Sequence, residues 1–256
     1  MRLLLTGAAY QLRLLRRSPG DLIALATTPL LTVVFLAVVE HNGRPDLAVN
    51  AVLAPALIAL WGMSLLIAGD MIDAERATGT FEVLVATPAR LWPLFTGRVL
   101  VVTVVSLLGL VESWLVATVV FGVPLRVAHP GLFAVTLLAT VLAMSGHAGV
   151  MTSLFVLSRS ARIFQNSLSF PFYVLGGVLV PVALLPAFLR PVSTVVFLSW
   201  SADLLRDSLR PAAPDSPVLR VGMVLGLGAA GAALSWWLLS VVLRRARRTG
   251  SIALGG

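Results

Sequence analysis

The chain alternates between long apolar runs and short polar stretches. Five runs contain no Asp, Glu, Lys or Arg, and a sixth is interrupted only by Glu112. A spanning helix needs about 20 consecutive apolar residues, and the alternation typical of membrane strands does not recur along the chain. The pattern therefore predicts an all-α integral membrane protein with a single transmembrane domain over residues 1–256. The six predicted transmembrane helices lie at about residues 21–39, 48–69, 99–122, 131–157, 163–182 and 218–243.

Composition and charge placement agree with this class and predict an orientation. Hydrophobic residues make up 58% of the chain, charged residues 12%, and the mean hydropathy is +0.97. The 19 basic residues are all arginines, concentrated at the two termini and in the second and fourth connections between spans. Because basic residues are enriched in cytoplasmic loops, we expect both termini in the cytoplasm of a bacterial inner membrane. Anionic lipid headgroups account for the net charge of +8, so no nucleic acid partner is expected.

Residues 2–17 predict an amphipathic helix that lies in the headgroup plane. Leucines are interspersed there with four arginines, and Ser18-Pro19-Gly20 then turns the chain inward. The helix is either a surface anchor alone or an elbow that also touches a cytoplasmic partner. No small-residue cleavage site follows, so we expect the first span to act as its own insertion signal. The chain contains no cysteine, so neither disulfides nor thiol chemistry are expected.

Residues 70–98 form a polar, charged segment between the second and third predicted spans. Gly79 is placed to end a first helix, and Thr80 can cap a second short helix over 81–86, with Glu82 in its first turn. A simple connection between two helices takes about five residues, whereas this segment is far longer and has charged and apolar faces. We therefore predict a cytoplasmic docking element; the alternative is a helix that rests on the lipid surface.

The sequence E-R-A-T-G-T-F-E-V-L-V-A-T-P at residues 75–88 resembles the signature of type-2 ABC exporter permeases. In that family this segment is the coupling helix, which sits in a groove of the ATPase subunit. The arginine-rich start, the six spans and the stretch from Leu185 to Asp207 extend the resemblance over essentially the whole chain. It implies a coupling segment at 70–98 and a re-entrant external helical hairpin at 183–212, between the fifth and sixth spans. The coupling residues that it implies are Glu75, Arg76, Gly79, Thr80, Phe81, Glu82 and Leu84.

The resemblance also implies a transport subunit that is not itself an enzyme. A G-x-x-x-x-G-K-[ST] phosphate loop is missing from the sequence, and without lysine none can form. We therefore expect no cofactor and no metal on this chain, with ATP and Mg²⁺ used by a separate ATP-binding subunit. Members of the family work as two permeases with two ATPases. The expected partners are thus two ATP-binding subunits, a second copy of the chain, the lipid bilayer and a small amphipathic substrate.

Two groups of residues are candidates for the substrate path. In the family, spans two and five line a central cavity, and polar and aromatic residues mix in both spans here. The candidates either line the path or pack between membrane helices. They are Trp61, Met63 and Ser64 in span two, and Asn166, Ser167, Phe170 and Tyr173 in span five. In the hairpin, Phe188, Phe197 and Trp200 either gate the exit or anchor the interface.

Glu112 is an acid inside a predicted span, and His147 in the fourth span is its titratable companion. A carboxylate within a membrane is a functional candidate because its burial is costly. Glu112 is a proton relay, a contact for a cationic substrate, or a protonated structural group. If Glu112 is a proton relay, the chain is a proton-coupled secondary carrier, which is the remote alternative for its function. Intramembrane proteases are disfavoured, because H-E-x-x-H is missing and no histidine follows His147.

The predicted function is that of the membrane-spanning subunit of an ATP-driven exporter. The chain is most similar to the drug-resistance branch of the family, so we expect efflux of an amphipathic antibiotic or drug by alternating access. Its alanine and arginine usage suggests a GC-rich genome, as in antibiotic-producing bacteria. Export of a lipid-linked saccharide or a polysaccharide is the alternative.

Overall fold

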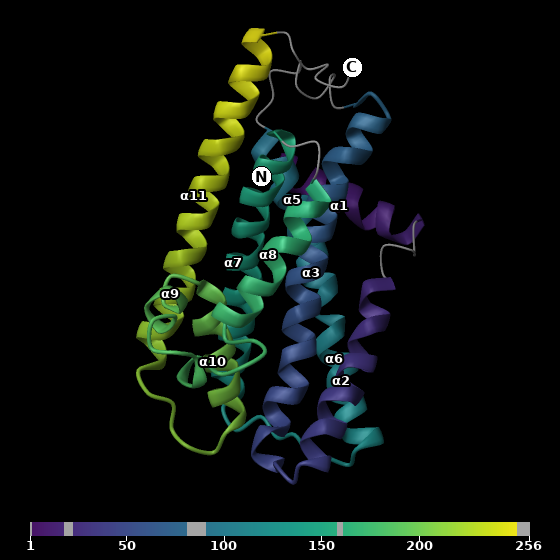
Figure 1. Ribbon diagram of the computed structural model, residues 1–256. Coiled ribbons are helices and arrows are strands. Elements are labelled where there is room, and N and C mark those ends of the chain that lie inside the picture. Colours follow the sequence, from purple (N-terminus) through teal and green to yellow (C-terminus); the bar gives the residue numbers. More distant parts are fainter. Residues whose placement is uncertain (1, 18–22, 81–90, 158–160, 250–256) are drawn as a thin grey trace.

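The computed structural model describes residues 2–17, 23–80, 91–157 and 161–249. All regular structure in these residues is helical, and the long helices run side by side in one bundle (Figure 1). The all-helical class predicted from the sequence is therefore confirmed. The helices are α1 (Arg2–Arg17), α2 (Ile23–His41), η2 (Pro45–Leu47), α3 (Ala48–Ala77), α5 (Leu91–Ser106), α6 (Leu108–Leu115), η3 (Val116–Val120), α7 (Pro130–Leu157), α8 (Ala161–Leu175), η4 (Val182–Leu184), α9 (Arg190–Ser193), α10 (Phe197–Leu209) and α11 (Pro217–Thr249).

Within the described residues, 4 helical stretches are long and apolar enough to cross a membrane. The first predicted span is a shorter apolar helix, Leu25–His41. The fifth corresponds to α8, which has 15 residues and contains Pro171. The chain is thus a multi-pass membrane protein, and six spans stays a prediction. The 4 stretches are Pro45–Leu65, Leu91–Val120, Pro130–Leu154 and Pro217–Arg244.

The helices on both sides of the predicted docking segment extend beyond the predicted membrane spans, each as one continuous helix. Helix α3 continues to Ala77, and α5 already begins at Leu91. Helix-compatible residues without a proline follow the apolar part of α3, so the helix continues until Gly79, whose φ of +68° glycine adopts without strain. Pro93 falls in the first turn of α5, where a missing N–H is tolerated. The connection between the two helices is therefore confined to the residues between Ala77 and Leu91.

Helices α7 and α11 pack closely because small residues face each other where they cross. A side-chain carbon added at Gly228 would lie 2.7 Å from the Cα of Ala143, and one added at Gly146 would lie 2.7 Å from the carbonyl oxygen of Gly228. A carbon added at Gly149 would collide with the hydroxyl of Ser235. Small residues allow such close approach in a membrane, where helix association depends on packing. This crossing holds α11 against the bundle.

A cluster of aromatic rings fills the core between α3, α7, α8 and α10. The ring of Trp61 stacks on that of Phe172 with 4.4 Å between centroids, and the Phe197 ring lies 6.4 Å from Trp61 and 4.5 Å from His147. Trp61 and Phe197 are fully buried. Each aromatic pair contributes about 0.5–1.5 kcal/mol beyond its area burial. The cluster therefore joins α10 of the hairpin to the membrane helices.

Arg206 of α10 connects the hairpin to the end of α8. Its guanidinium donates hydrogen bonds to the backbone carbonyls of Gly177 and Val178, and to Asp203 Oδ1 at 2.9 Å. These carbonyls belong to the turn that follows α8, which ends at Leu175. Burial raises the pKa of Asp203, and the charge of Arg206 opposes that shift. Arg206 thus ties the turn after α8 to α10 of the hairpin.

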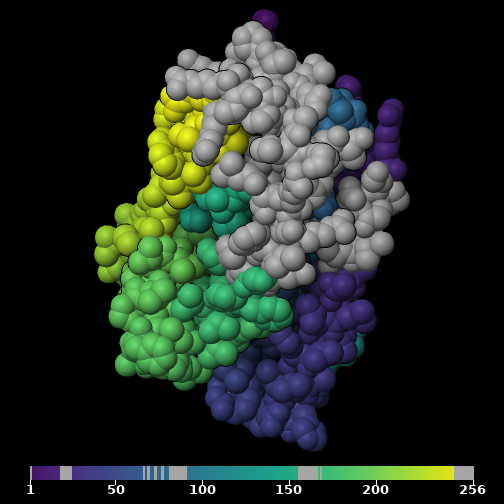
Figure 2. Space-filling model, turned by 45° about the horizontal axis from the view of Figure 1, so that its top comes forward, coloured from purple at the N-terminus to yellow at the C-terminus, as the bar shows by residue number. Residues whose placement is uncertain are grey.

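The two ends of the bundle carry different elements. The hairpin elements η4, α9 and α10 lie at the same end as the turn between α2 and α3 (Figure 1). The last turn of α3, helix α1 and the C-terminal end of α11 lie toward the opposite end. Figure 2 shows the hairpin as one continuous mass beside the start of α11. The predicted coupling segment and the predicted external hairpin are therefore separated by the length of the bundle.

Candidate functional site

Helix α1 crosses the first turns of α5 in close backbone contact. Gly7 of α1 faces the carbonyl group of Leu94, and Gly97 of α5 faces the carbonyl group of Leu4. A side-chain carbon added at either glycine would collide with the facing backbone. Each glycine therefore allows the other helix to approach, and α1 packs on the membrane bundle through one of its faces.

Beside this crossing, Arg98 joins three helices. Its Nη1 donates to Glu75 Oε1 at 2.8 Å, and its Nε donates to Gln11 Oε1 at 3.1 Å. The guanidinium carbon also lies 4.9 Å from the centroid of the Tyr10 ring. Gln11 belongs to α1, Glu75 to α3 and Arg98 to α5. We name Gln11, Glu75 and Arg98 the elbow cluster, because they tie these three helices together.

Glu75 also holds the turn that ends α3. Thr80 Oγ1 donates to Glu75 Oε2 at 2.5 Å, and the hydroxyl oxygens of Thr78 and Thr80 are 2.8 Å apart. Gly79 lies between these two threonines and has positive φ, which reverses the chain direction. Both carboxylate oxygens of Glu75 are thus bound within the chain, one by Arg98 and one by Thr80.

The elbow cluster is shielded from solvent. The side chains of Arg98 and Glu75 are 3% and 11% exposed, and Gln11 is 1% exposed. An ion pair in such surroundings persists only when further hydrogen bonds satisfy both partners, and removal of one partner costs about 3–5 kcal/mol. Gln11 and Thr80 supply those further bonds. The elbow cluster therefore resists separation of α1, α3 and α5.

Three of the residues predicted to form the coupling element come together at the end of α3. Glu75, Gly79 and Thr80 form the turn described above, and their role in coupling stays a prediction. The backbone of Arg76 belongs to α3, and its side chain lies outside the described part of the chain. Phe81, Glu82 and Leu84 also lie outside the described residues, and their docking roles stay predictions.

Gly7, Gln11, Gly97 and Arg98 are not among the site residues predicted from the sequence. Helix α1 does carry a signal, because Gly7, Gln11 and Leu15 recur every four residues and share one helix face. All three are buried. An amide on such a stripe indicates a buried hydrogen-bond partner. Arg98 carries no local signal, since its carboxylate partner is 23 positions away.

The span-two candidates for the substrate path are enclosed by the chain itself. Trp61, Met63 and Ser64 are at most 1% exposed. The hydroxyl of Ser64 donates to the Leu60 carbonyl at 2.8 Å and lies 3.0 Å from Thr103 Oγ1. In this structure the three side chains pack between helices and line no open path.

The span-five candidates fall into two environments. Tyr173 is buried, and its hydroxyl donates to the carbonyl of Ile58 at 3.4 Å. Ser167 and Phe170 are exposed on α8, Phe170 by 69%. The side chain of Asn166 lies outside the described part of the chain. Ser167 and Phe170 are therefore the candidates that α8 presents outward.

The three candidates for an exit gate also differ in exposure. Phe188 is 75% exposed in the hairpin, whereas Phe197 is buried against the ring of His147. The indole nitrogen of Trp200 donates to the carbonyl of Thr194 at 2.9 Å, which holds the ring within the hairpin. Of these three aromatic residues, Phe188 has the largest free surface.

Glu112 and His147 lie on different helices and contact different neighbours. His147 Nδ1 lies 2.9 Å from the carbonyl oxygen of Ala143, and its ring packs on Phe197. Glu112 belongs to α6, which packs on α2 and α3, and its buried Oε2 has no hydrogen-bond partner among the described residues. The neighbouring Ser113 bonds to α2 instead of to Glu112. The two titratable residues therefore do not form a joint relay within this chain.

Taken together, these features define a multi-pass helical membrane protein in which buried polar contacts join three helix ends at one end of the bundle. The family model of the ABC-2 type transporter matches residues 2–209, and the chain belongs to this family. No match to the chain is found among curated proteins. The chain is thus the transmembrane component of an ABC transporter, a class that works with ATP-binding subunits. The matched region includes α1, the elbow cluster and the hairpin through Leu209.

Proposed function

We propose that the chain is the membrane subunit of an exporter driven by a separate ATP-binding subunit, which docks on the segment between Ala77 and Leu91. The observation that carries this proposal is the elbow cluster at the base of that segment, where Gln11, Glu75 and Arg98 join α1, α3 and α5. A loop that only connected two spans would not need a buried ion pair, whose desolvation is costly. A segment that receives force needs such a fixed base.

Force on this segment acts on α3 and α5 together, because the Glu75–Arg98 pair joins them. When two ATP-binding subunits close on ATP and Mg²⁺, they displace the segment and both helices with it. Helix α3 has 30 residues, so it is about 45 Å long at 1.5 Å per residue and reaches the opposite end of the bundle. The displacement is thereby converted into alternating access across the membrane.

Helix α1 extends the same connection to the membrane surface. Gln11 binds Arg98 from the inner face of α1, and Arg13, Arg16 and Arg17 are exposed on the rest of the helix. Exposed arginines beside a membrane are attracted to anionic headgroups. In our proposal α1 is therefore an interfacial elbow that holds the coupling segment at a fixed depth, in a bacterial inner membrane with both termini in the cytoplasm.

The proposed assembly contains two copies of the chain and two ATP-binding subunits, and its proposed cargo is an amphipathic antibiotic or drug. Ser167 and Phe170, which α8 presents outward, support a cargo with apolar and polar parts. Export of a lipid-linked saccharide or a polysaccharide is the second candidate. Drug sensitivity of cells that express the chain with its ATP-binding subunit separates the two: protection from an amphipathic antibiotic supports the first, and no protection from any such compound supports the second.

Glu82→Ala tests the docking itself. We expect normal insertion of the chain, and a loss of roughly tenfold or more in binding of the copurifying ATP-binding subunit, which corresponds to about 1.4 kcal/mol of interface energy.

Gly79→Pro should uncouple ATP hydrolysis from transport, because proline cannot adopt positive φ. Asp46→Ala is the matched control, since Asp46 is exposed in an ion pair with Arg44 at the hairpin end. Unchanged binding and export in both Glu82→Ala and Gly79→Pro would contradict the proposal.

A further inference from the structure

We propose that a groove between α5, α7 and α11 binds the aliphatic chain of an amphiphile, with an oxygen of its head group accepting a hydrogen bond from Trp92. The groove has a volume of about 290 Å³, close to the lower end of ligand pockets, about 300 Å³. It lies on other helix faces than the elbow cluster, and its occupancy does not depend on the proposed coupling to an ATP-binding subunit.

The groove opens toward the lipid. Leu142 of α7 and Leu225 of α11 line it and are 54% and 43% exposed. Both residues lie within stretches long and apolar enough to span the membrane. The small residues Gly146, Gly228 and Ala232 form its floor, where the backbones of α7 and α11 pack against each other. An aliphatic chain can therefore enter the groove from the bilayer without first crossing the protein.

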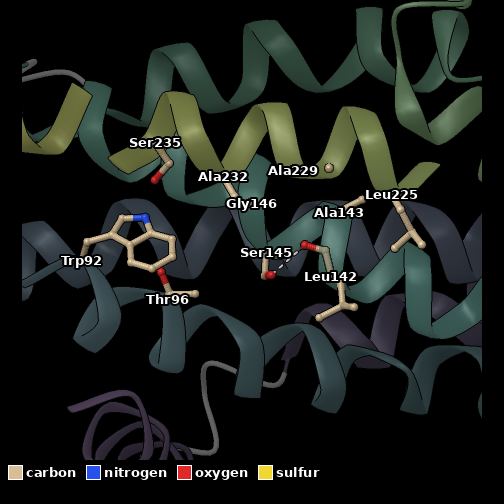
Figure 3. Close-up of a pocket in the computed structure, with 11 residues that line it drawn as sticks. Trp92, Thr96, Leu142, Ala143, Ser145, Gly146, Leu225, Ala229, Ala232 and Ser235 are labelled. Atoms are coloured by element: carbon tan, nitrogen blue, oxygen red, sulfur yellow. Dashed lines mark hydrogen bonds between the residues drawn. The ribbon is translucent and has the colours of Figure 1, made fainter. Parts of the chain in front are cut away.

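One end of the groove is polar and the other is apolar. Figure 3 shows Trp92, Thr96 and Ser235 at one end, and Leu142 and Leu225 at the other. Trp92 lies in the first turn of α5, at the end of the bundle that carries α1. The groove thus fits an amphiphile with its head group near α1 and its chain directed toward the middle of the membrane.

The indole nitrogen of Trp92 identifies the chemistry of that head group. Among the residues that the structure describes, this Nε1 is buried and has no hydrogen-bond partner. Buried donors are nearly always paired, and the proposal assigns the acceptor to the head group of the amphiphile. A membrane helix of a second copy offers fewer free acceptors, because its carbonyls are already bonded within the helix. An ester, hydroxyl or phosphate oxygen of an amphiphile is free to accept the bond.

The length of the groove agrees with one leaflet of the bilayer. Leu225 and Ser235 are ten residues apart on α11, which is about 15 Å at 1.5 Å per residue. The hydrocarbon core is about 30 Å thick, so half of it is about 15 Å. A chain that starts at Trp92 and follows the groove to Leu225 therefore spans one leaflet. Such a chain belongs either to a resident membrane lipid or to an exchangeable single-chain amphiphile.

Photo-crosslinking of the full chain in nanodiscs tests the proposal. The probe is phosphatidylglycerol with a diazirine midway along one acyl chain, and mass spectrometry maps the labelled peptides. We expect label on α7 near residues 142–146 and on α11 near 225–232. Ala229→Phe, at an exposed position that lines the groove, should fill it and lower this labelling by roughly tenfold. Ala233→Phe, one turn further along and outside the groove lining, should leave it unchanged.

Trp92→Phe tests the hydrogen bond, because it keeps a ring and removes the donor. Labelling at low probe concentration should fall about two- to tenfold, the range for one net hydrogen bond. Displacement of the probe by excess long-chain alcohol indicates an exchangeable amphiphile, and resistance to displacement indicates a bound lipid; both support the proposal. Ala229→Leu replaces Ala229→Phe if that variant does not fold.

Three results would overturn the proposal: equal labelling of the parent and the filled variant, no effect of Trp92→Phe, or a groove that cross-links to a second copy in place of the probe. The experiment uses the chain without an ATP-binding subunit. A failure of the proposed coupling therefore leaves its outcome unaffected.

Discussion

Arg98 and Glu75 form a buried ion pair that joins the first part of α5 to the last turn of α3 across 23 positions of sequence. Glu75→Gln and Arg98→Gln each leave one charge buried and unpaired, so each should destabilise the chain by about 3–5 kcal/mol. The double variant should lose much less than the sum, because two amides can still bond to each other and to Gln11 and Thr80. Unfolding curves of the purified chain and its three variants in detergent measure the coupling.

The exposed pair of Arg44 and Asp46 is the control for this experiment. Both side chains are 59% exposed, so Asp46→Asn should cost only about 0–1 kcal/mol. If Glu75→Gln costs no more than Asp46→Asn, the elbow cluster does not hold the three helices together, and the proposed route of force through it fails.

The local sequence pattern was sufficient to predict parts of this fold. The apolar runs predicted the helices because a spanning helix must satisfy its backbone internally and expose apolar side chains. Gly79 was correctly expected to end a helix, since positive φ has a recognisable residue preference. The continuity of this helix with the second span, as one helix α3 that ends at Ala77, was not predicted, because charged residues signal the membrane boundary but do not end a helix.

Long-range contacts explain what the pattern could not show. The sequence predicted Trp61 to line the substrate path and Phe197 to gate the exit, yet both are fully buried in one aromatic cluster. Which face of an apolar helix meets lipid, and which meets another helix, is not encoded by hydropathy when both surroundings are apolar. Arg98 was likewise assigned to a loop. Its partners come from two other helices, so no local pattern indicates that it is buried.

Gly7→Val should release α1 from α5. The added side chain would collide with the carbonyl of Leu94, and a helix backbone cannot move aside locally. Because the chain has no cysteine, a single Leu15→Cys substitution reports on the buried face of α1. Maleimide should label Cys at this buried position slowly in the parent, and roughly tenfold faster when Gly7→Val is added, as expected for a loss of about 1.4 kcal/mol of packing.

Ala9→Val provides the matched comparison, since Ala9 is exposed on the same helix. It should leave the labelling rate unchanged. Equal protection of Leu15→Cys in the Gly7→Val and Ala9→Val backgrounds would show that the glycine crossing does not fix α1.

Two glycines of α11 should respond oppositely to the same substitution. Gly228→Ala places a methyl group 2.7 Å from the Cα and Cβ of Ala143, and such overpacking costs about 1–3 kcal/mol. Gly226→Ala meets nothing within 4 Å, and alanine favours a helix by about 1 kcal/mol over glycine. Thermal unfolding in detergent should therefore show a lower midpoint for the first variant and an equal or higher midpoint for the second. The same sign for both would mean that α7 and α11 do not meet at Gly228.

Arg206→Gln should loosen the hairpin from the end of α8. The parent side chain is 3% exposed and binds Asp203 and the carbonyls of Gly177 and Val178, so its loss leaves a carboxylate and two backbone acceptors without their donor. The Asp203 side chain is 38% exposed and stays solvated, so the cost is that of the lost hydrogen bonds to buried acceptors, about 1–3 kcal/mol. Limited proteolysis at the hairpin and the unfolding midpoint both measure the effect.

Arg210→Gln is the control for the hairpin, because Arg210 is 51% exposed and lies 4.0 Å from Asp207. Its loss should cost at most about 1 kcal/mol. Asp203→Asn should fall between the two, since it removes the charge partner of Arg206 but leaves the bonds to the two carbonyls in place. This order of destabilisation is expected if Arg206 stabilises the hairpin mainly through its bonds to the two carbonyls after α8. If Asp203→Asn destabilises the chain as much as Arg206→Gln does, the ion pair is the main contribution instead.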